Sequence, residues 1–230
     1  MNRVFWLKQG ARSVPLRGVI FDLDGTLTKP VLDFELIRAK LGLAPRTDIV
    51  QSIEQWPEPR RSWGHQTVEE WETEALERFQ LEPAVPDLLK LLASAGILGA
   101  VVTRNSDTAL LHLEQHLQAA GLPPFSMALS RSFQPSKPYA APLLHIIDCW
   151  RLSSPDLADL LPENILMVGD GLDDVKAGRA AGVSTCFLHT HSTLLTDELR
   201  RLSDLIYPSI NELYLQLRDH QVLEIGESPP

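Results

Sequence analysis

The segment GVIFDLDGTL, residues 18–27, runs from a short apolar stretch into two aspartates and a glycine. Residues 19–21 have the composition of a strand that is buried on both faces of a parallel sheet. In an extended chain, residues two apart point to the same side and lie roughly 6.6 Å apart, so Asp22 and Asp24 could face one small site. A turn with a capping aspartate followed by glycine explains this segment equally well by itself. The remainder of the chain has to separate these two interpretations.

Composition narrows the class of protein. The chain has 230 residues, of which 44% are hydrophobic, so it is long enough for one sizeable domain or for a core with a small partner domain. The formal net charge of -9 argues against a broad nucleic-acid surface, which requires clustered lysine and arginine. An anionic substrate would need a local basic group or a metal ion, because the overall field repels it.

Cysteine content and hydropathy predict a protein of the cytoplasm. Cys149 and Cys186 have no CxxC spacing, so the sequence indicates neither a disulfide framework nor a zinc site. No apolar run approaches the roughly 18 residues of a membrane span, and we expect no membrane partner. Residues 1–21 hold basic residues but no acidic ones, which leaves an organelle-targeting segment open as an alternative. The oligomeric state is not indicated.

Strand-like and helical patterns alternate along the chain. The strand-like runs are 18–22, 97–102, 125–129, 165–169 and 184–188. Helical patterns lie between most of them, and an alanine-rich one at 172–181 ends at Gly182, which predicts a C-cap. This alternation predicts an α/β fold with a doubly wound parallel sheet. Such sheets bind ligands at the carboxyl ends of their strands.

The interval between the first two predicted strands is too long for one crossover helix. Within it, apolar residues repeat at helical spacing in two segments, at Phe34, Ile37 and Leu41 and at Val68, Trp71, Ala75 and Phe79. We therefore expect an inserted helical cap at 30–82, an α/β core formed by 1–29 and 83–220, and a flexible tail at 221–230. Three tryptophans are expected to form the core of the cap: Trp56, Trp63 and Trp71.

Polar residues follow each later strand of the predicted core. Thr103 ends the second strand, Lys137 follows the third, and Asp170, Asp173 and Asp174 follow the fourth. Each has an ordinary structural explanation when taken alone. Asn105 or Ser106, after the threonine, can cap a helix, and a lone lysine is usually solvated. One acid at the start of a helix compensates the helix dipole. Three acids exceed what capping requires. A carboxylate cluster that meets two more aspartates from the first strand is a ligand set that Mg²⁺ prefers.

These residues together resemble the motifs of the haloacid dehalogenase superfamily. DLDGT at 22–26, Thr103, Lys137 and GDGLDD at 169–174 match its four motifs in order, each at a strand end. The resemblance covers residues 18–190 and is closest to phosphatases of the phosphoglycolate phosphatase type, with a small helical cap inserted after the first strand. Arg104 departs from the small or amide residues that are common after the threonine.

The resemblance implies a Mg²⁺-dependent phosphohydrolase that cleaves a small phosphomonoester through an aspartyl-phosphate intermediate. Asp22 would attack the phosphoryl group, and Asp24 would protonate the leaving oxygen and then deprotonate water. The implied metal ligands are Asp22, the backbone carbonyl of Asp24, Asp170 and Asp174. The implied phosphate-binding groups are Thr103, the backbone N–H of Arg104 and Lys137.

Several alternatives stay open. A sugar phosphomutase would use the same core, and a phosphoacceptor switch or a binding protein would be non-enzymatic. Dehalogenation is disfavoured, because a halide leaving group would not need the proton of Asp24. In the cap, the candidates for a second substrate anion are Arg38, Arg46, Arg60, Arg61 and His65, and the segment PRRSWGH at 59–65 is predicted to be a specificity loop. Solvated surface arginines are the ordinary explanation for the same residues.

Overall fold

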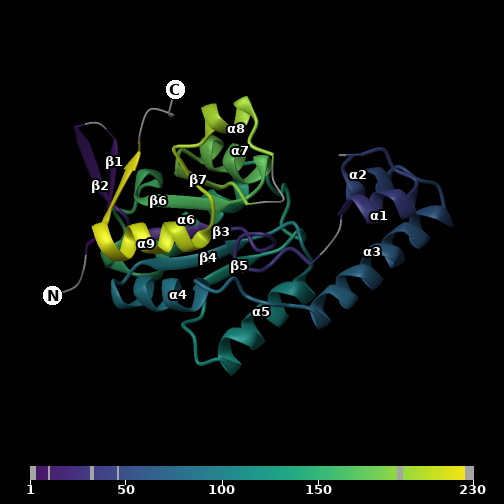
Figure 1. Ribbon diagram of the computed structural model, residues 1–230, viewed down its shortest axis with the longest axis horizontal. Coiled ribbons are helices and arrows are strands. Elements are labelled where there is room, and N and C mark those ends of the chain that lie inside the picture. The colour runs from purple at the N-terminus through teal and green to yellow at the C-terminus, as the bar shows by residue number, and fades with distance from the viewer. Residues whose placement is uncertain (1–3, 10, 32–33, 46, 191–193, 226–230) are drawn as a thin grey trace. The chain divides into compact units, whose positions relative to one another are not determined.

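A computed structural model describes residues 4–9, 11–31, 34–45, 47–190 and 194–225 of the chain (Figure 1). The chain divides into two compact units. The first, here called the core unit, holds the residues up to Thr28 and from Leu81 onward, and the second, here called the helical unit, is Lys29–Gln80. The expected insertion at 30–82 differs from the helical unit by one residue at its start and two at its end.

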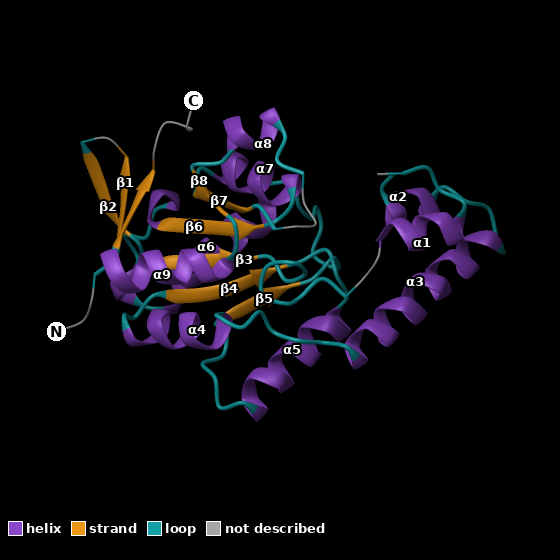
Figure 2. Cartoon of the chain, in the orientation of Figure 1, coloured by secondary structure: helices purple, strands orange, loops and turns teal. Residues whose placement is uncertain are grey.

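A six-stranded sheet runs through the core unit. Its strands are β3 (Gly18–Phe21), β4 (Leu98–Val102), β5 (Met127–Leu129), β6 (Ile165–Gly169), β7 (Ser184–Leu188) and β8 (Leu205–Tyr207), in the spatial order β5-β4-β3-β6-β7-β8. All neighbouring pairs are parallel. Helices and strands alternate along this part of the chain, as Figure 2 shows in purple and orange. The predicted α/β fold with a doubly wound parallel sheet is confirmed.

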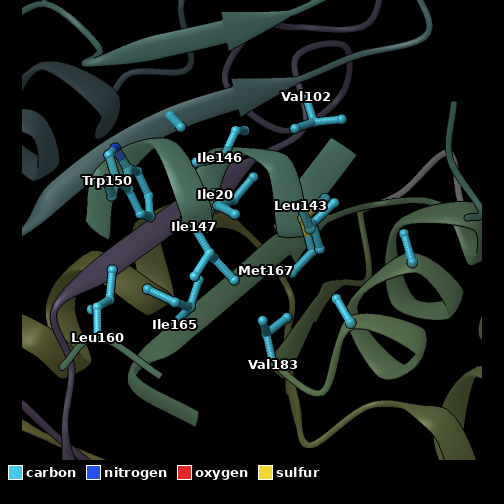
Figure 3. Packing of buried hydrophobic residues seen from close by; sticks show 13 residues of the cluster. Ile20, Val102, Leu143, Ile146, Ile147, Trp150, Leu160, Ile165, Met167 and Val183 are labelled. Atoms are coloured by element: carbon cyan, nitrogen blue, oxygen red, sulfur yellow. The ribbon is translucent and has the colours of Figure 1, made fainter. Parts of the chain in front are cut away.

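Helices cover both faces of this sheet. Those of the core unit are α4 (Val85–Ser94), α5 (Asp107–Ala119), α6 (Ala141–Ser153), α7 (Leu172–Ala181), α8 (Asp197–Leu202) and α9 (Ile210–His220), with short 3-10 turns at Pro155–Leu157 and Pro162–Asn164. Helices α4 and α9 contact each other on one side (Figure 1). On the other side, Leu143, Ile147 and Trp150 of α6 meet Ile20 of β3 and Met167 of β6 (Figure 3). Burial of both faces explains why these strands are continuously apolar.

Helix α7 begins and ends at the residues that the sequence predicts. It runs from Leu172 to Ala181, and Gly182 follows with a φ of 73°, in the left-handed region. Alanine and glycine on its inner side bring it close to the sheet, since a Cβ on Gly178 would lie 2.6 Å from Cγ2 of Thr185 in β7. This close packing holds the N-terminus of α7 near the carboxyl end of β6.

A second, small sheet was not expected from the sequence. It joins β1 (Trp6–Gln9), β2 (Arg12–Pro15) and β9 (Val222–Ile225) in the order β2-β1-β9. Strands β1 and β2 are antiparallel, whereas β1 and β9 are parallel and set Leu7 opposite Leu223, both fully buried. The expectation of a flexible tail from residue 221 is wrong for 222–225, because the backbone of this segment is paired with β1.

The helical unit contains α1 (Phe34–Leu41), α2 (Ile49–Glu54) and α3 (Arg60–Glu77). Its core is formed by Ile37, Leu41 and Ile53, with Trp56 and Trp71 partly buried against them. Trp63 is 44% exposed, so its expected place in this core is wrong. Its ring stacks on that of Trp56, with ring centroids 6.4 Å apart. The next residue, Gly64, is the one that faces Ile53, because successive helical residues point about 100° apart.

The predicted specificity loop is also wrong in its conformation, because Arg60 to His65 form the first turns of α3. Among the residues described, none of the helices combines the length and the apolar character that crossing a bilayer requires.

Candidate active site

The sequence-predicted site residues follow neighbouring strands at the carboxyl edge of the six-stranded sheet. Asp22 and Thr103 come directly after β3 and β4, and Asp170 comes directly after β6. The ladder continues through the first two, because the N–H of Asp22 donates to Val168 O at 2.9 Å and the N–H of Thr103 donates to Leu129 O at 2.9 Å. Strand order thus brings together side chains that are far apart in the sequence.

Lys137 links two of these carboxylates. Its Nζ lies 2.5 Å from Oδ1 of Asp22 and 2.6 Å from Oδ1 of Asp174, and the lysine is 3% exposed. Burial by itself would lower the pKa of the Lys137 ammonium, but the charges of Asp174 and Asp22 more than reverse this and raise it. Lys137 is therefore a permanent positive charge inside the site.

Three carboxylates gather around this charge. One oxygen each from Asp22, Asp170 and Asp174 lie within 4.8 Å of one another. Burial, followed by the charges of Asp22 and Asp174, raises the pKa of Asp170 to about 8. Burial likewise raises the pKa of Asp174 to about 6, although the charge of Lys137 opposes the shift. Burial also raises the pKa of Asp22, again against the charge of Lys137. One lysine does not neutralise this cluster.

The residues of this cluster fit a divalent cation. Their donors are all carboxylate oxygens, which hard ions such as Mg²⁺ prefer, and the raised pKa values show that the carboxylates lack sufficient positive charge. The carboxylate of Asp24 does not belong to the cluster that the described residues form.

Two glycines give the carboxylates room. Gly25 has a φ of 80°, which favours glycine, and a Cβ on it would overlap the carboxylate of Asp170. A Cβ on Gly169 would overlap the carboxylate of Asp174 in the same way. Asp174 is held further by the N–H of Gly171, which donates to its Oδ2 at 2.9 Å. The glycines of the DLDGT and GDGLDD segments are therefore spatial requirements of the cluster.

Asp24 contacts Asn105, which the sequence analysis considered only as a helix cap. Nδ2 of Asn105 donates to Oδ2 of Asp24 at 3.0 Å. Ser106 is the N-cap of α5, and its Oγ accepts from the N–H of Ala109. The one signal in the sequence was the place of Asn105, three residues past the end of the predicted strand at 97–102.

The two remaining predicted phosphate-binding residues lie at the end of β4. Thr103 is buried, and its Oγ1 accepts from the N–H of Asn105 at 3.0 Å. The guanidinium of Arg104 turns toward α7, where Nη1 lies 2.6 Å from Oδ2 of Asp173. The side chains of Arg104 and Asp173 are 42% and 37% exposed, so this pair lies at the solvent side of the site.

The candidate specificity residues of the helical unit have partners within that unit. Arg38 pairs with Glu35, Arg61 with Glu58 and His65 with Glu54. The guanidinium of Arg60 lies 4.0 Å from the ring centre of Trp56. Arg46 lies outside the described residues. These contacts favour the surface interpretation of the four described side chains.

Comparison with protein families identifies a match over most of the chain. A family model described as haloacid dehalogenase-like hydrolase matches residues 16–182. A haloacid dehalogenase-like hydrolase domain-containing protein of Arabidopsis thaliana is 36% identical over 185 residues, which cover 75% of this chain and 71% of that protein.

Two relatives from Pseudomonas aeruginosa carry more specific names. An N-acetylmuramic acid 6-phosphate phosphatase is 28% identical, over 83% of this chain and 95% of its own length. Phosphoglycolate phosphatase 1 is 29% identical, over 81% of this chain and 78% of its own length.

Solved structures share the fold. A predicted phosphoglycolate phosphatase from Haemophilus somnus superposes with a TM-score of 0.63 at 22% identity, over 89% of this chain and 98% of that one. A protein assigned as a beta-phosphoglucomutase from Thermotoga maritima superposes with a TM-score of 0.62 at 19% identity, over 89% and 99% of the two chains.

Proposed function

The chain belongs to the haloacid dehalogenase-like hydrolase family, and from that premise we propose that it is a Mg²⁺-dependent phosphatase of small phosphomonoesters. The observation that carries the proposal is the buried Lys137, which contacts both Asp22 and Asp174 beside Asp170 at the carboxyl edge of the sheet. This arrangement offers a carboxylate nucleophile, a fixed positive charge and an oxygen-rich cation site within one small space.

Asp22 is the proposed nucleophile. Its Oδ1 is held by Lys137, which fixes the carboxylate and favours its ionised form. A carboxylate oxygen of Asp22 forms a bond to phosphorus while the bond from phosphorus to the ester oxygen breaks, so an aspartyl-phosphate and an alcohol result. Water then attacks phosphorus, which releases inorganic phosphate and regenerates the carboxylate.

Asp24 is the proposed acid and base. In the first step its carboxyl proton passes to the leaving ester oxygen, and in the second step the carboxylate accepts a proton from the attacking water. The side chain is partly exposed, in contrast to the buried Asp22, so a leaving group and a water molecule have access to it. The two aspartates of the DLDGT segment thus have separate tasks because their surroundings differ.

Positive charge and N–H donors would hold the transferred phosphoryl group. Asp22, Asp170, Asp174 and the backbone carbonyl of Asp24 are the proposed ligands of Mg²⁺, which when bound offsets the negative charge that accumulates on the phosphoryl oxygens. Thr103, the N–H of Arg104 and Lys137 are the proposed phosphate-binding groups, and a fixed ammonium stabilises the developing charge without rearrangement. These local positive charges counter the repulsion that the net charge of -9 exerts on an anionic substrate.

The substrate proposed is a small phosphorylated metabolite, as for the relatives named after phosphoglycolate and N-acetylmuramic acid 6-phosphate. The sugar phosphomutase stays the second candidate, because a structure assigned to a beta-phosphoglucomutase shares the fold. A mutase would return a rearranged sugar phosphate and release little inorganic phosphate, so product analysis separates the two.

The test is phosphate release from a panel of small phosphomonoesters, with and without Mg²⁺. We expect turnover that requires Mg²⁺ and that falls by at least about 10³-fold in Asp22→Asn, since the amide is a poor nucleophile. Asp173→Asn is the matched control, because Asp173 is adjacent to Asp174 but partly exposed and outside the carboxylate cluster. Retention of full turnover by Asp22→Asn would overturn the proposal.

A further inference from the structure

Asn105 connects the segment after β4 to the proposed acid and base. Its Nδ2 donates to Oδ2 of Asp24 at 3.0 Å, although the two residues are 81 positions apart. Since β3 and β4 are neighbours in the sheet, both residues lie just beyond the carboxyl ends of adjacent strands. The contact is therefore a product of the sheet topology.

The side-chain amide of Asn105 is fixed in one orientation. Its Oδ1 accepts from the N–H of Ser106 at 2.7 Å, and only the amide oxygen can accept from that donor. The NH₂ group must then face Asp24, whose Oδ2 accepts from it. A flipped amide would set N–H against N–H and oxygen against oxygen.

The backbone of Asn105 is held equally firmly. Its N–H donates to Oγ1 of Thr103 at 3.0 Å, and its carbonyl accepts from the N–H of Arg131 at 3.0 Å. Capping of α5 does not require the NH₂ group, because Ser106 is the N-cap. The donor that faces Asp24 is thus rigidly placed and is not used to hold α5.

We propose that Asn105 is a positioning residue that orients the carboxyl group of Asp24 for its proton transfers, an inference that rests on the proposed phosphatase function. The N–H of Asn105 donates to Oδ2 of Asp24 and so restricts rotation of that carboxyl group. Asp24 gives its proton to the ester oxygen as the bond from that oxygen to phosphorus breaks, and its carboxylate accepts a proton from the attacking water.

Leaving groups of different basicity test this role. An alkyl phosphate releases a strongly basic alkoxide that needs the proton, whereas p-nitrophenyl phosphate releases a stable phenolate that hardly needs it. General acid catalysis contributes about 10²–10⁴-fold, so we expect Asn105→Ala to lower kcat/KM for the alkyl ester, which reports the steps up to cleavage of the ester bond, by roughly 10–100-fold. The same variant should change kcat/KM for the nitrophenyl ester by less than about threefold. Hydrolysis of the aspartyl-phosphate is common to both esters, so a slower second step lowers kcat for both and leaves this comparison unchanged.

Two further variants separate positioning from folding. Asn105→Asp keeps the size of the side chain and an acceptor for the N–H of Ser106 but has no N–H for Asp24, so it should show the same selective loss. Ser106→Ala removes the N-cap of α5 without touching Asp24, and it should affect the two esters equally. Thermal unfolding of each variant measures any loss of stability.

The outcomes are distinct. A selective loss on the alkyl ester in both Asn105 variants supports the positioning role. Unchanged kcat/KM, or an equal loss of kcat/KM on both esters, in an otherwise active enzyme overturns the positioning role alone. A wild-type protein without Mg²⁺-dependent turnover, or an active Asp22→Asn, overturns the proposed function and the positioning role with it.

Discussion

The buried aspartates at the carboxyl edge of the sheet lower the stability of the folded protein. Asp22, Asp170 and Asp174 are brought together with one lysine, and burial together with the charge of neighbouring aspartates raises the pKa of each. Such shifts are typical of functional sites, because a group that packs only for stability avoids buried like charges. The cluster should therefore destabilise the protein whenever no cation is bound.

Replacement of Asp170 tests this destabilisation. In the folded protein its pKa is about 8, against an ordinary value of 3.8, so the folded state disfavours the ionised form. The penalty is absent below pH 4 and grows as pH rises toward 8, where the folded state must also ionise. In a metal-free buffer, Asp170→Asn should therefore raise the melting temperature, and the rise should be larger at pH 8 than at pH 5, by roughly 2–4 °C for each kcal/mol.

Thermal unfolding in a chelator at both pH values provides the measurement, with Asp173→Asn as the control that leaves the cluster intact. Addition of Mg²⁺ should stabilise the wild type and the control more than Asp170→Asn, because a ligand stabilises the state that binds it. A lower melting temperature for Asp170→Asn at pH 8 would contradict this account.

At the level of elements, strand β9 is part of the folded core although it lies near the end of the described chain. It pairs in parallel with β1, and Leu223 is fully buried opposite Leu7. Leu217 of α9, which precedes β9, is also buried. Helix α9 is consequently held by its buried residues and strand β9 by its pairing with β1. The small sheet thus joins the first and last strands of the core unit.

Leu223→Ala measures this contribution. Truncation of a fully buried leucine costs about 2–5 kcal/mol, because apolar contacts are lost and a cavity remains. Glu224→Ala is the control on the same strand, since its exposed ion pair with Lys8 contributes at most about 1 kcal/mol. Urea unfolding gives both values, and a Leu223→Ala protein as stable as the wild type would show that β9 is dispensable.

For the whole molecule, the helical unit is inserted between two segments of the core unit that are hydrogen-bonded to each other. Thr28 and Leu81 form an antiparallel bridge, and the N–H of Glu82 donates to Leu27 O at 2.9 Å. The ends of the core unit at the insertion therefore lie side by side. An insertion with adjacent ends is compatible with a core that folds without it.

Excision of Lys29–Gln80, with a short glycine–serine linker between Thr28 and Leu81, should leave a folded core unit. We expect circular dichroism typical of an α/β protein and stabilisation by Mg²⁺, because the carboxylate cluster and Lys137 lie wholly in the core unit. An unfolded protein, or a folded one that Mg²⁺ does not stabilise, would contradict the prediction.

Local patterns in the sequence were sufficient for five strands of the larger sheet and for the candidate residues that follow them, but not for β8 or for the small sheet. Strand β6 and helix α7 have the predicted bounds, because a buried strand and a helix with a glycine C-cap are encoded by adjacent residues. The polar residues at strand ends followed from the same patterns. Trp63 shows where this reasoning failed, since helical spacing did not determine which side of α3 faces Ile53.

Only the tertiary structure decided which of these residues meet. The contacts of Lys137 with Asp22 and of Asn105 with Asp24 join positions 115 and 81 apart, and they depend on the order of strands in the sheet. The pairing of β1 with β9 likewise joins the two ends of the core unit. Periodicity reports how a segment lies against its immediate surroundings, but strand order results from the packing of the entire chain, so no short segment contains it.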